Sequence, residues 1–400
     1  MAVVAAWVGI DAGKAKHHAV AIDGDGDVLW SVKVDNDQQA IVELLARAAA
    51  VDGEVRWAVD LTSPVAALLL GLLLHAGQRV VFVPGRTVNR MAGAFRGEGK
   101  TDAKDARIIA ETARMRHRDL TVVTAPDDLA IELSRLTAHR SDLSAEWVRG
   151  VNRLRELLTS VFPALERAFD FTTRSALMLV SEYCTPTALR SVDEEQLAAQ
   201  LARLGARNSA TMAVTAVRAA SGQDIVLPGE ATTALLIKRL ARQLLELDRS
   251  IRDTSKLIAE RFRTHPQATI IESLPGMGPI LGAELVAMTG GDPRALFANP
   301  GRLAAQAGLV PVPKDSGRVS GNLHRPKRYH RGLRRVFFMA ALSSIKAGGA
   351  SSAYYQRKRG ENRMHQQAIL ALARRLVDVL WALLRDNRTF SPAAPTHATT

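Results

Sequence analysis

The stretch WVGID, residues 7–11, decides the fold of the first part of the chain. It is a short apolar run that ends in an acid, which is typical of a buried strand with a polar residue at its carboxyl end. A second apolar run follows at 18–22, and the DGDG segment at 23–26 is a strong hairpin signal. The sequence therefore predicts that the chain begins in a β-sheet.

Outward from this start, strand and helix patterns alternate up to about residue 83. Further strands are predicted at 28–34, 55–59 and 79–83, and helices at 38–50 and 64–76. With a helix near residue 107, the order is β-β-β-α-β-α-β-α, which is that of the ribonuclease H-like fold. In such a sheet the ends of the first and fourth strands are neighbours, so Asp11 and Asp60 are expected to lie side by side.

Two further acids lie in the segment 99–106, GKTDAKDA, directly before the helical pattern. Asp102 and Asp105 are three residues apart and share one face of a helix. Their like charges repel, and a divalent metal between them would relieve the repulsion. For this segment alone, a solvated acidic pair flanked by basic residues is the alternative. Together with Asp11 and Asp60, the pair predicts an Mg²⁺ site of the kind that two-metal phosphoryl transfer uses.

The positive charge of the chain is concentrated at one end. The whole chain of 400 residues carries +13, whereas residues 301–400 hold 18 Lys and Arg against four Asp and Glu, which is +14. Such a local excess indicates a surface for a polyanion. Cys184 is the only cysteine, so no internal disulfide is expected. Because no signal peptide or spanning segment is recognisable, we expect a cytoplasmic protein without a membrane partner.

The middle of the chain has helical patterns. Heptad-like apolar spacing at 128–169 and again at 236–262 predicts two helices that pair as an antiparallel coiled-coil stalk. Residues 171–228 between them are predicted to be mostly helical and carry no functional motif. Long stalks often mediate assembly, so a homo-oligomer, dimer or tetramer, is expected.

The C-terminal part carries two loop signals. The segment 274–279, LPGMGP, resembles a helix-hairpin-helix turn, in which Gly276 and Gly278 would let backbone N–H groups approach a phosphate. A turn between packed helices is an equally good interpretation. Further on, a Gly-, Pro- and Ser-rich loop at 307–321 precedes a basic run. The candidate nucleic-acid-binding cations are Lys314, Arg318, Arg325, Lys327, Arg328, Arg331, Arg334 and Arg335.

These motifs together resemble the DEDD-type insertion-sequence transposases, a family that includes pilin-gene invertases and recombinases guided by a bridge RNA. The resemblance covers nearly the whole chain except the part near 171–228. The motifs that carry it are Gly9-Ile10-Asp11, Asp60-Leu61-Thr62, Val83-Pro84, GKTDAKDAR at 99–107, Leu274-Pro275-Gly276-Met277-Gly278, Ala307-Gly308-Leu309-Val310-Pro311 and Ser316-Gly317. Asp60 stands where the family usually has Glu, whose side chain is one methylene longer.

The resemblance implies a domain organisation and a set of partners. It implies a RuvC-like nuclease-fold domain at 1–125, a coiled-coil stalk with a helical insert at 126–265 and a mostly helical transposase domain at 266–388. Residues 389–400 are rich in Pro, Ala and Thr, which predicts a disordered tail. The resemblance further implies that the four acids bind Mg²⁺ and that the partners are donor and target DNA and a structured guide RNA.

The resemblance also implies a serine nucleophile in the C-terminal domain. Ser316 fits best because of its Ser-Gly context, while Ser320, also followed by Gly, and Tyr329 are the rivals. A serine hydroxyl is a weak nucleophile until it is activated, and metal ions can activate it and hold a phosphate in line. The acids and Ser316 fall in different predicted domains, so the complete site would form only when the domains close.

Three other functions stay open on the sequence alone. A RuvC-like junction-resolving endonuclease would use the same acids with water as nucleophile, and a covalent protein–DNA adduct would exclude it. An actin-like sugar kinase would share the glycine-rich start at 9–13, but the chain lacks the second Asp-Gly-rich phosphate loop. A non-enzymatic nucleic-acid-binding protein would have no catalytic activity, so removal of magnesium could change its binding only.

Overall fold

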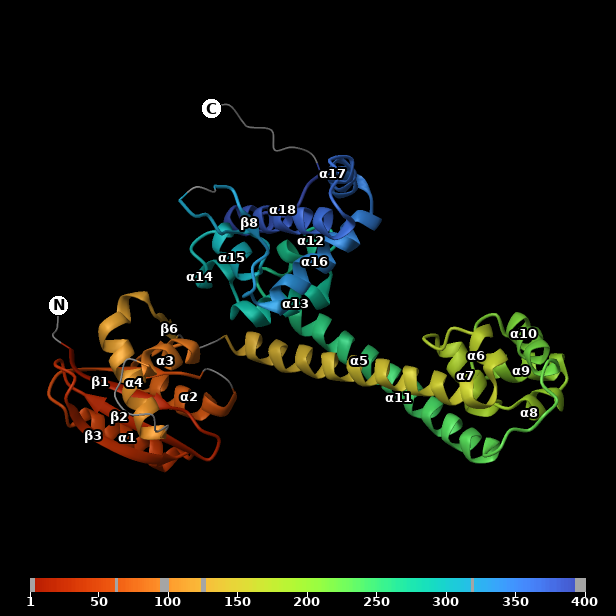
Figure 1. The fold of residues 1–400 in the computed structure, drawn as a ribbon, viewed down its shortest axis with the longest axis horizontal. Coiled ribbons are helices and arrows are strands. Elements are labelled where there is room, and N and C mark those ends of the chain that lie inside the picture. Colours follow the sequence, from red (N-terminus) through yellow and green to blue (C-terminus); the bar gives the residue numbers. More distant parts are fainter. Residues whose placement is uncertain (1–3, 62–63, 94–100, 124–126, 318–319, 393–400) are drawn as a thin grey trace. The chain divides into compact units, whose positions relative to one another are not determined.

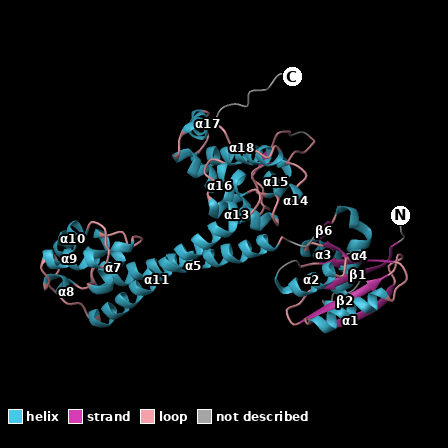
Figure 2. Cartoon of the chain, turned by 180° about the vertical axis from the view of Figure 1, so that it is seen from behind, coloured by secondary structure: helices cyan, strands magenta, loops and turns pink. Residues whose placement is uncertain are grey.

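The computed structural model describes residues 4–61, 64–93, 101–123, 127–317 and 320–392. The chain divides into two compact units, Met1–Pro126 and Asp127–Thr400. The first unit, red to orange in Figure 1, is mixed α/β, and the described part of the second is mostly helical. This division into an α/β part and an α part confirms the fold class predicted at that level (Figure 2). No helix in the described ranges has the length and apolar character needed to cross a bilayer.

The first unit is built on a six-stranded sheet with the order β3-β2-β1-β4-β5-β6. Its strands are β1 (Val4–Asp11), β2 (Lys16–Ile22), β3 (Val28–Asp35), β4 (Glu54–Val59), β5 (Arg79–Phe82) and β6 (Thr121–Val123). Its helices are α1 (Gln38–Ala49), η1 (Pro64–Ala66), α2 (Ala67–His75), α3 (Gly85–Ala92), α4 (Asp102–Arg116) and η2 (His117–Asp119). Strands β1, β4 and β5 run parallel, and the others are antiparallel to their neighbours.

The order of the first five strands and of helices α1, α2 and α4 agrees with the sequence prediction, but α3 and β6 were not predicted. Strand β6 has only three residues, and it pairs with β5 through Val80 and Val123. A segment that short carries no readable period, so its strand conformation depends on the edge that β5 offers.

Side-chain alternation in the strands separates two cores. Val8 and Ile10 of β1 pack on one face of the sheet in a core that includes α1 and α2. Trp7 packs on the other face with α4. Gly9 shares that second face, and a Cβ added to it would lie 2.2 Å from the carbonyl oxygen of Ala106. Helix α4 therefore lies against β1 at a distance that only glycine permits.

In the second unit, two long helices pack against each other, α5 (Asp128–Val161) and α11 (Glu230–Phe262). Helices α5 and α11, the yellow and green ribbons of Figure 1, lie side by side there and also in Figure 2. They run antiparallel, because Arg261 Nε donates to Glu132 Oε1 at 2.7 Å while Arg140 Nε donates to Ser255 Oγ, also at 2.7 Å. Leu133 and Ile258 are buried in one core that both helices share, whereas Leu236 of the predicted apolar pattern is 47% exposed.

The segment between these helices folds into a helical cluster. It contains α6 (Pro163–Ala168), α7 (Arg174–Glu182), α8 (Pro186–Arg190), α9 (Glu194–Arg203) and α10 (Ser209–Ser221). Phe162, Phe171 and Leu197 are buried in its core, which also takes in parts of α5 and α11. The mostly helical character predicted for 171–228 is confirmed.

The remainder of the second unit surrounds another core, which includes Phe262 and Phe337. It contains α12 (Ala268–Ser273), α13 (Pro279–Thr289), α14 (Pro293–Leu296), α15 (Pro300–Gln306), β7 (Val312–Pro313), β8 (Leu323–His324), α16 (Arg331–Lys346), α17 (Gly349–Gly360) and α18 (His365–Arg385). Of the tail predicted to be disordered, residues 393–400 lie outside the described residues.

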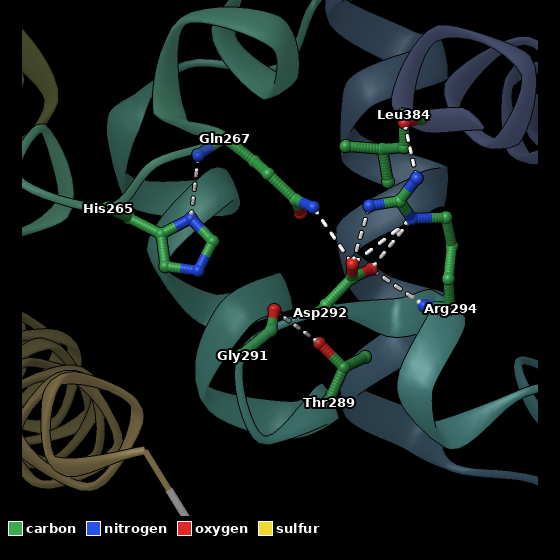
Figure 3. Close-up of polar contacts among 7 residues, drawn as sticks. All are labelled: His265, Gln267, Thr289, Gly291, Asp292, Arg294 and Leu384. Atoms are coloured by element: carbon green, nitrogen blue, oxygen red, sulfur yellow. Dashed lines mark hydrogen bonds and ion pairs between the residues drawn. The ribbon is translucent and has the colours of Figure 1, made fainter. Parts of the chain in front are cut away.

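One polar network ties these helices together, as Figure 3 shows. The carboxylate of Asp292 accepts from Gln267 Nε2 at 2.9 Å and from Arg294 Nη2 at 2.7 Å, and it also caps the start of α14. Arg294 Nη1 in turn donates to the carbonyl of Leu384 on α18 at 2.6 Å. The Arg294 guanidinium and the Gln267 amide hold the pKa of Asp292 below its usual value, so this carboxylate serves structure.

Candidate active site

The register of the sheet brings three functional side chains to one face and one edge. Asp11 ends β1, and its antiparallel partner in β2 is His18. Ile10 is aligned with Val59 of the parallel strand β4, so Asp60 follows next to Asp11. Because side chains alternate along a strand, Asp11 and Asp60 point to the same face as Gly9, the face that α4 covers.

The other two acids begin the helix that covers this face. Thr101 is the N-cap of α4, and its hydroxyl accepts from the Lys104 N–H at 3.2 Å. Asp102 and Asp105 both lie in the first helical turn. The helix N-terminus favours negative charge there, so the helix itself accommodates this pair even without a cation. The preceding Gly99 and Lys100 of the motif lie outside the described residues.

The electrostatics shows which of these groups interact. Burial raises the pKa of Asp60, and the negative charge of Asp105 raises it further, although the Ala12 N–H donates to Asp60 Oδ1 at 3.4 Å and opposes the shift. At the other strand, burial lowers the pKa of His18, and the charge of Asp102 acts against this. The charge of Asp105 is thus felt at Asp60, and the charge of Asp102 at His18, the strand partner of Asp11.

Two acids at the ends of β1 and β4 and two at the start of α4 suit a divalent cation in their chemistry. Carboxylate oxygens are the hard ligands that Mg²⁺ prefers, and the raised pKa of Asp60 reflects buried negative charge that a cation would relieve. Within the described ranges, no three His, Cys, Asp or Glu side chains are gathered closely enough to hold an ion as they stand.

Sequence reasoning missed His18 as a member of this edge. The imidazole is 9% exposed, and its Nε2 lies 2.8 Å from Ser31 Oγ of β3. The signal was present, because residues 7–11 and 18–22 were predicted as neighbouring strands and an antiparallel register pairs Asp11 with His18. However, the sequence does not fix how many residues form the turn between these two strands. A register shifted by one residue was therefore equally compatible with it.

Ser316 lies on a short hairpin, where the sequence predicted an irregular loop. Strands β7 and β8 pair antiparallel, and the Lys314 N–H donates to the Asn322 carbonyl at 2.8 Å. The Asn322 N–H donates to Asp315 Oδ1 at 3.0 Å, which closes the base of the loop. Ser316 and its rival Ser320 are both exposed, while Arg318 lies outside the described residues. The hairpin presents a hydroxyl to solvent and leaves the choice between the two serines open.

The basic residues around the hairpin fall into two groups. The first group is exposed and forms no ion pair with any acid that the structure describes: Lys314, Arg325, Lys327, Arg328 and Arg331. The second group holds the fold. Arg334 Nη1 donates to the Gly308 carbonyl at 3.0 Å and its guanidinium lies over the Tyr329 ring at 4.7 Å, while Arg335 Nη1 pairs with Glu284 Oε2 at 2.5 Å. The exposed group is the better source of phosphate contacts.

Tyr329, the other rival nucleophile, takes part in this packing. Arg325 Nη2 donates to its hydroxyl at 3.2 Å, and the hydrogen bond together with nearby guanidinium groups lowers the pKa of the phenol. Its ring also fills the space beside Gly308, where an added Cβ would lie 2.5 Å from it. Tyr329 therefore has a structural role that neither serine has.

The two glycines of the 274–279 turn differ. Gly276 has φ +79°, and a Cβ there would lie 2.0 Å from the Ala340 carbonyl of α16. Its need for glycine follows from packing between helices, the second of the two interpretations. Gly278 is the exposed N-cap of α13 and has open space around it, so it stays a candidate for a phosphate contact.

Comparison with known proteins gives two family matches and several long alignments. Residues 8–163 match a family model described as a transposase of the DEDD IS110 type, and residues 268–356 match the transposase family IS116/IS110/IS902. The chain is 53% identical over 390 residues to a 44.8 kDa protein of insertion element IS116 from Streptomyces clavuligerus, covering 97% of both chains. It is 51% identical over 395 residues to a 42 kDa protein of IS900 from Mycobacterium paratuberculosis, covering 98% of both.

A third relative is more distant but equally complete. The 43.6 kDa protein of IS110 from Streptomyces coelicolor is 32% identical over 394 residues, which is 98% of this chain and 97% of that one. The first family match spans all four acids at the sheet edge, and the second spans the Ser316 hairpin. The family predicted from the motifs is thereby confirmed: this chain belongs to the IS110/IS116/IS902 family of insertion-sequence transposases and is an enzyme that cuts and rejoins DNA.

Proposed function

We propose that this transposase recombines DNA through a covalent phosphoserine, with Ser316 as nucleophile and Asp11, Asp60, Asp102 and Asp105 as the ligands of Mg²⁺ in a RuvC-like domain. The observation that supports the proposal is that Asp11 and Asp60 end the neighbouring strands β1 and β4, and that Asp102 and Asp105 begin helix α4, which packs on β1. Phosphoryl transfer by two metal ions requires such a set. The metal supplies charge neutralisation at the phosphate and activation of the hydroxyl.

The residues of the hairpin supply the nucleophile and the positive charge around it. Ser316 Oγ attacks phosphorus, so an Oγ–P bond forms, one P–O bond to the sugar breaks, and the leaving sugar oxygen takes up a proton. The phosphodiester energy is kept in the new ester, so rejoining needs no ATP. The exposed Lys314 and Arg325 supply positive charge close to the oxygens on which negative charge develops.

The decisive experiment is a trap for the covalent adduct. Wild-type protein with Mg²⁺, a DNA carrying the element ends and any required RNA should yield an alkali-labile protein–DNA adduct. Ser316→Ala should form none, because the substitution removes only an exposed hydroxyl and leaves the hairpin hydrogen bonds of Lys314 and Asn322 in place.

Two control variants locate the nucleophile. Ser320→Ala and Tyr329→Phe should retain the adduct. If Ser320→Ala alone abolishes it, the mechanism holds and the assignment moves by four residues. If the DNA is nicked and no adduct is trapped, the recombinase assignment is wrong. The protein would then be a junction-resolving endonuclease that uses water as nucleophile and the same acids.

We further propose that a structured RNA guides the choice of DNA. Support comes from the family resemblance and from the concentration of positive charge in residues 301–400, which exceeds what one catalytic phosphate requires. Protein purified from cells that carry only the coding region should fail to recombine until RNA transcribed from the flanking sequence is added. Sequence-specific recombination by RNA-free protein would refute guidance.

A further inference from the structure

A groove outside the carboxylate edge opens between the β7–β8 hairpin and helices α16, α17 and α18. Its volume is about 880 Å³. The described residues that line it include five cations and neither Asp nor Glu. The five are Arg325, Arg334, Lys358, Arg363 and Arg374. Three come from α17, α18 and the turn between them, beyond the basic run that the sequence singled out.

The charge in this groove is only partly balanced. Lys358 Nζ pairs with Glu361 at 2.7 Å, and Arg374 pairs with Asp378. Arg325, Arg334 and Arg363 form no ion pair with any acid that the structure describes. Like charges held together without counter-charge cost folding energy, and an anion in the groove would recover it.

An aromatic side chain completes the lining. Tyr354 of α17 is half-buried and packs against the core of this part of the unit. The guanidinium of Arg357 lies 4.9 Å from its ring centroid, and Lys358 Nζ lies 5.7 Å from it. Cations together with an aromatic ring are a combination that sites for single-stranded nucleic acids use, since phosphates meet the cations and bases or guanidinium groups stack on the ring.

We propose that this groove holds a single-stranded segment of nucleic acid, with phosphates on Arg325 and Arg363 and a base against Tyr354. The groove has the size of a pocket for small ligands, roughly 300–1,000 Å³, which suits individual nucleotides rather than a duplex. The proposal rests on the function proposed above and adds to it a partner site that shares only Arg325 with the proposed catalytic residues.

The position of the groove connects it to the nucleophile. Leu323 and His324 of β8 line it, and they pair with Pro313 and Val312 of β7. Ser316 follows β7 by three residues. A strand that leaves the groove along the hairpin would run toward this exposed hydroxyl.

The test uses the full-length wild-type chain without Mg²⁺, so that binding is measured without chemistry. The probes are short oligothymidylate carrying one 5-iodouracil and the matching RNA. Irradiation should cross-link the probe to Tyr354, as located by peptide mass spectrometry. Arg363→Ala should lower the slope of log K against log salt by about 0.7. Tyr354→Leu should weaken binding by roughly 5- to 150-fold.

A matched control separates the groove from general charge. Arg375 is exposed on the same helix α18 and does not line the groove, so Arg375→Ala should leave the slope unchanged. A cross-link that maps elsewhere, or equal effects of Arg363→Ala and Arg375→Ala, would overturn the proposal. A preference for the DNA probe assigns the groove to the cut strand, and a preference for RNA assigns it to the guide.

The two proposals fail separately. If Arg363→Ala binds like wild type while the wild-type protein forms its Ser316 adduct, the proposed binding in the groove is wrong and the phosphoserine mechanism stands. If the cross-link maps to Tyr354 while no adduct can be trapped, the groove stands and the nucleophile is wrong.

Discussion

The carboxylate edge and the Ser316 hairpin are built in opposite ways. At the edge, strand register, a helix cap and the close approach at Gly9 determine where the acids lie, and Asp60 is partly buried. Ser316 stands exposed on a hairpin whose strands have two residues each. Charge stabilisation requires a preorganised site, whereas a nucleophile that must reach a phosphate gains from exposure. The acids of the proposed metal site are thus held by the fold, whereas Ser316, the proposed nucleophile, would be positioned by its substrate.

The largest effect is expected at the prepared edge. Asp102→Asn keeps the shape of the side chain and removes its charge, so strand cleavage should fall by about 10³-fold or more, since a bound metal contributes several kcal/mol to such a reaction. Binding of duplex DNA should stay within about twofold, since phosphates are held by cations. Asp119→Asn, at an exposed acid of the same unit, is the control. Normal cleavage by the Asp102→Asn variant would show that the proposed metal site is wrong.

The exposed region should respond to salt instead. Replacing Arg325, Arg328 and Arg331 by Ala should lower the slope of log K against log salt for duplex DNA by up to about 2.7, at roughly 0.9 for each phosphate contact. Binding measured between 50 and 200 mM salt gives the slope. The triple variant with exposed Arg203, Arg207 and Arg218 replaced by Ala removes the same charge from the helical insert. An equal decrease in both triple variants would show that total charge, and no local surface, binds DNA.

A substitution at Gly9 tests whether the edge is rigid. In Gly9→Ala the new methyl group meets the Ala106 carbonyl at 2.2 Å and the Ala110 nitrogen at 2.3 Å, so α4 must shift. Overpacking of this kind costs about 1–3 kcal/mol. Chemical unfolding should show the loss, and cleavage should fall with it because Asp102 and Asp105 move with the helix. Gly24→Ala, which has open space around the new methyl, should change neither quantity.

A smaller, pH-dependent effect is expected at the ion pair beneath the basic surface. Burial raises the folded-state pKa of Glu284, and Arg335 opposes the shift. The folded state therefore favours the protonated form of Glu284. This contribution to stability is fully present below the pKa of Glu284 in the unfolded chain, and it is lost as the pH rises through the pKa of Glu284 in the folded protein. Arg335→Ala raises that pKa further, so it should cost about 1–2 kcal/mol at pH 8 and less at pH 5.

The control for this pair is the double variant Glu284→Gln, Arg335→Ala, which removes the charge as well as its partner. Its unfolding free energy should show no extra pH dependence relative to wild type. A loss in Arg335→Ala that is the same at both pH values would mean that Arg335 acts through packing of its side chain alone.

Much of the first unit could be predicted because its signals are local. Apolar runs that end in Asp11 and Asp60 mark strands and their carboxyl ends, and the Thr101 cap marks the start of α4. The family motifs extend across these same segments. The three-residue strand β6 and helix α3 could not be predicted, because their conformations depend on the sheet edge and on packing against α4 rather than on a period of their own.

The sequence by itself determined the family, the helical character of the second unit and the identity of the four acids. Each of these features depends on patterns of residues that are close along the chain. The tertiary structure alone decided that Gly276 serves helix packing, that Arg334 and Arg335 hold the fold, that His18 joins the carboxylate edge, and that cations of three helices share one groove. Charge and residue type are properties of the chain, whereas the partner of a charge depends on contacts between distant residues that only folding creates.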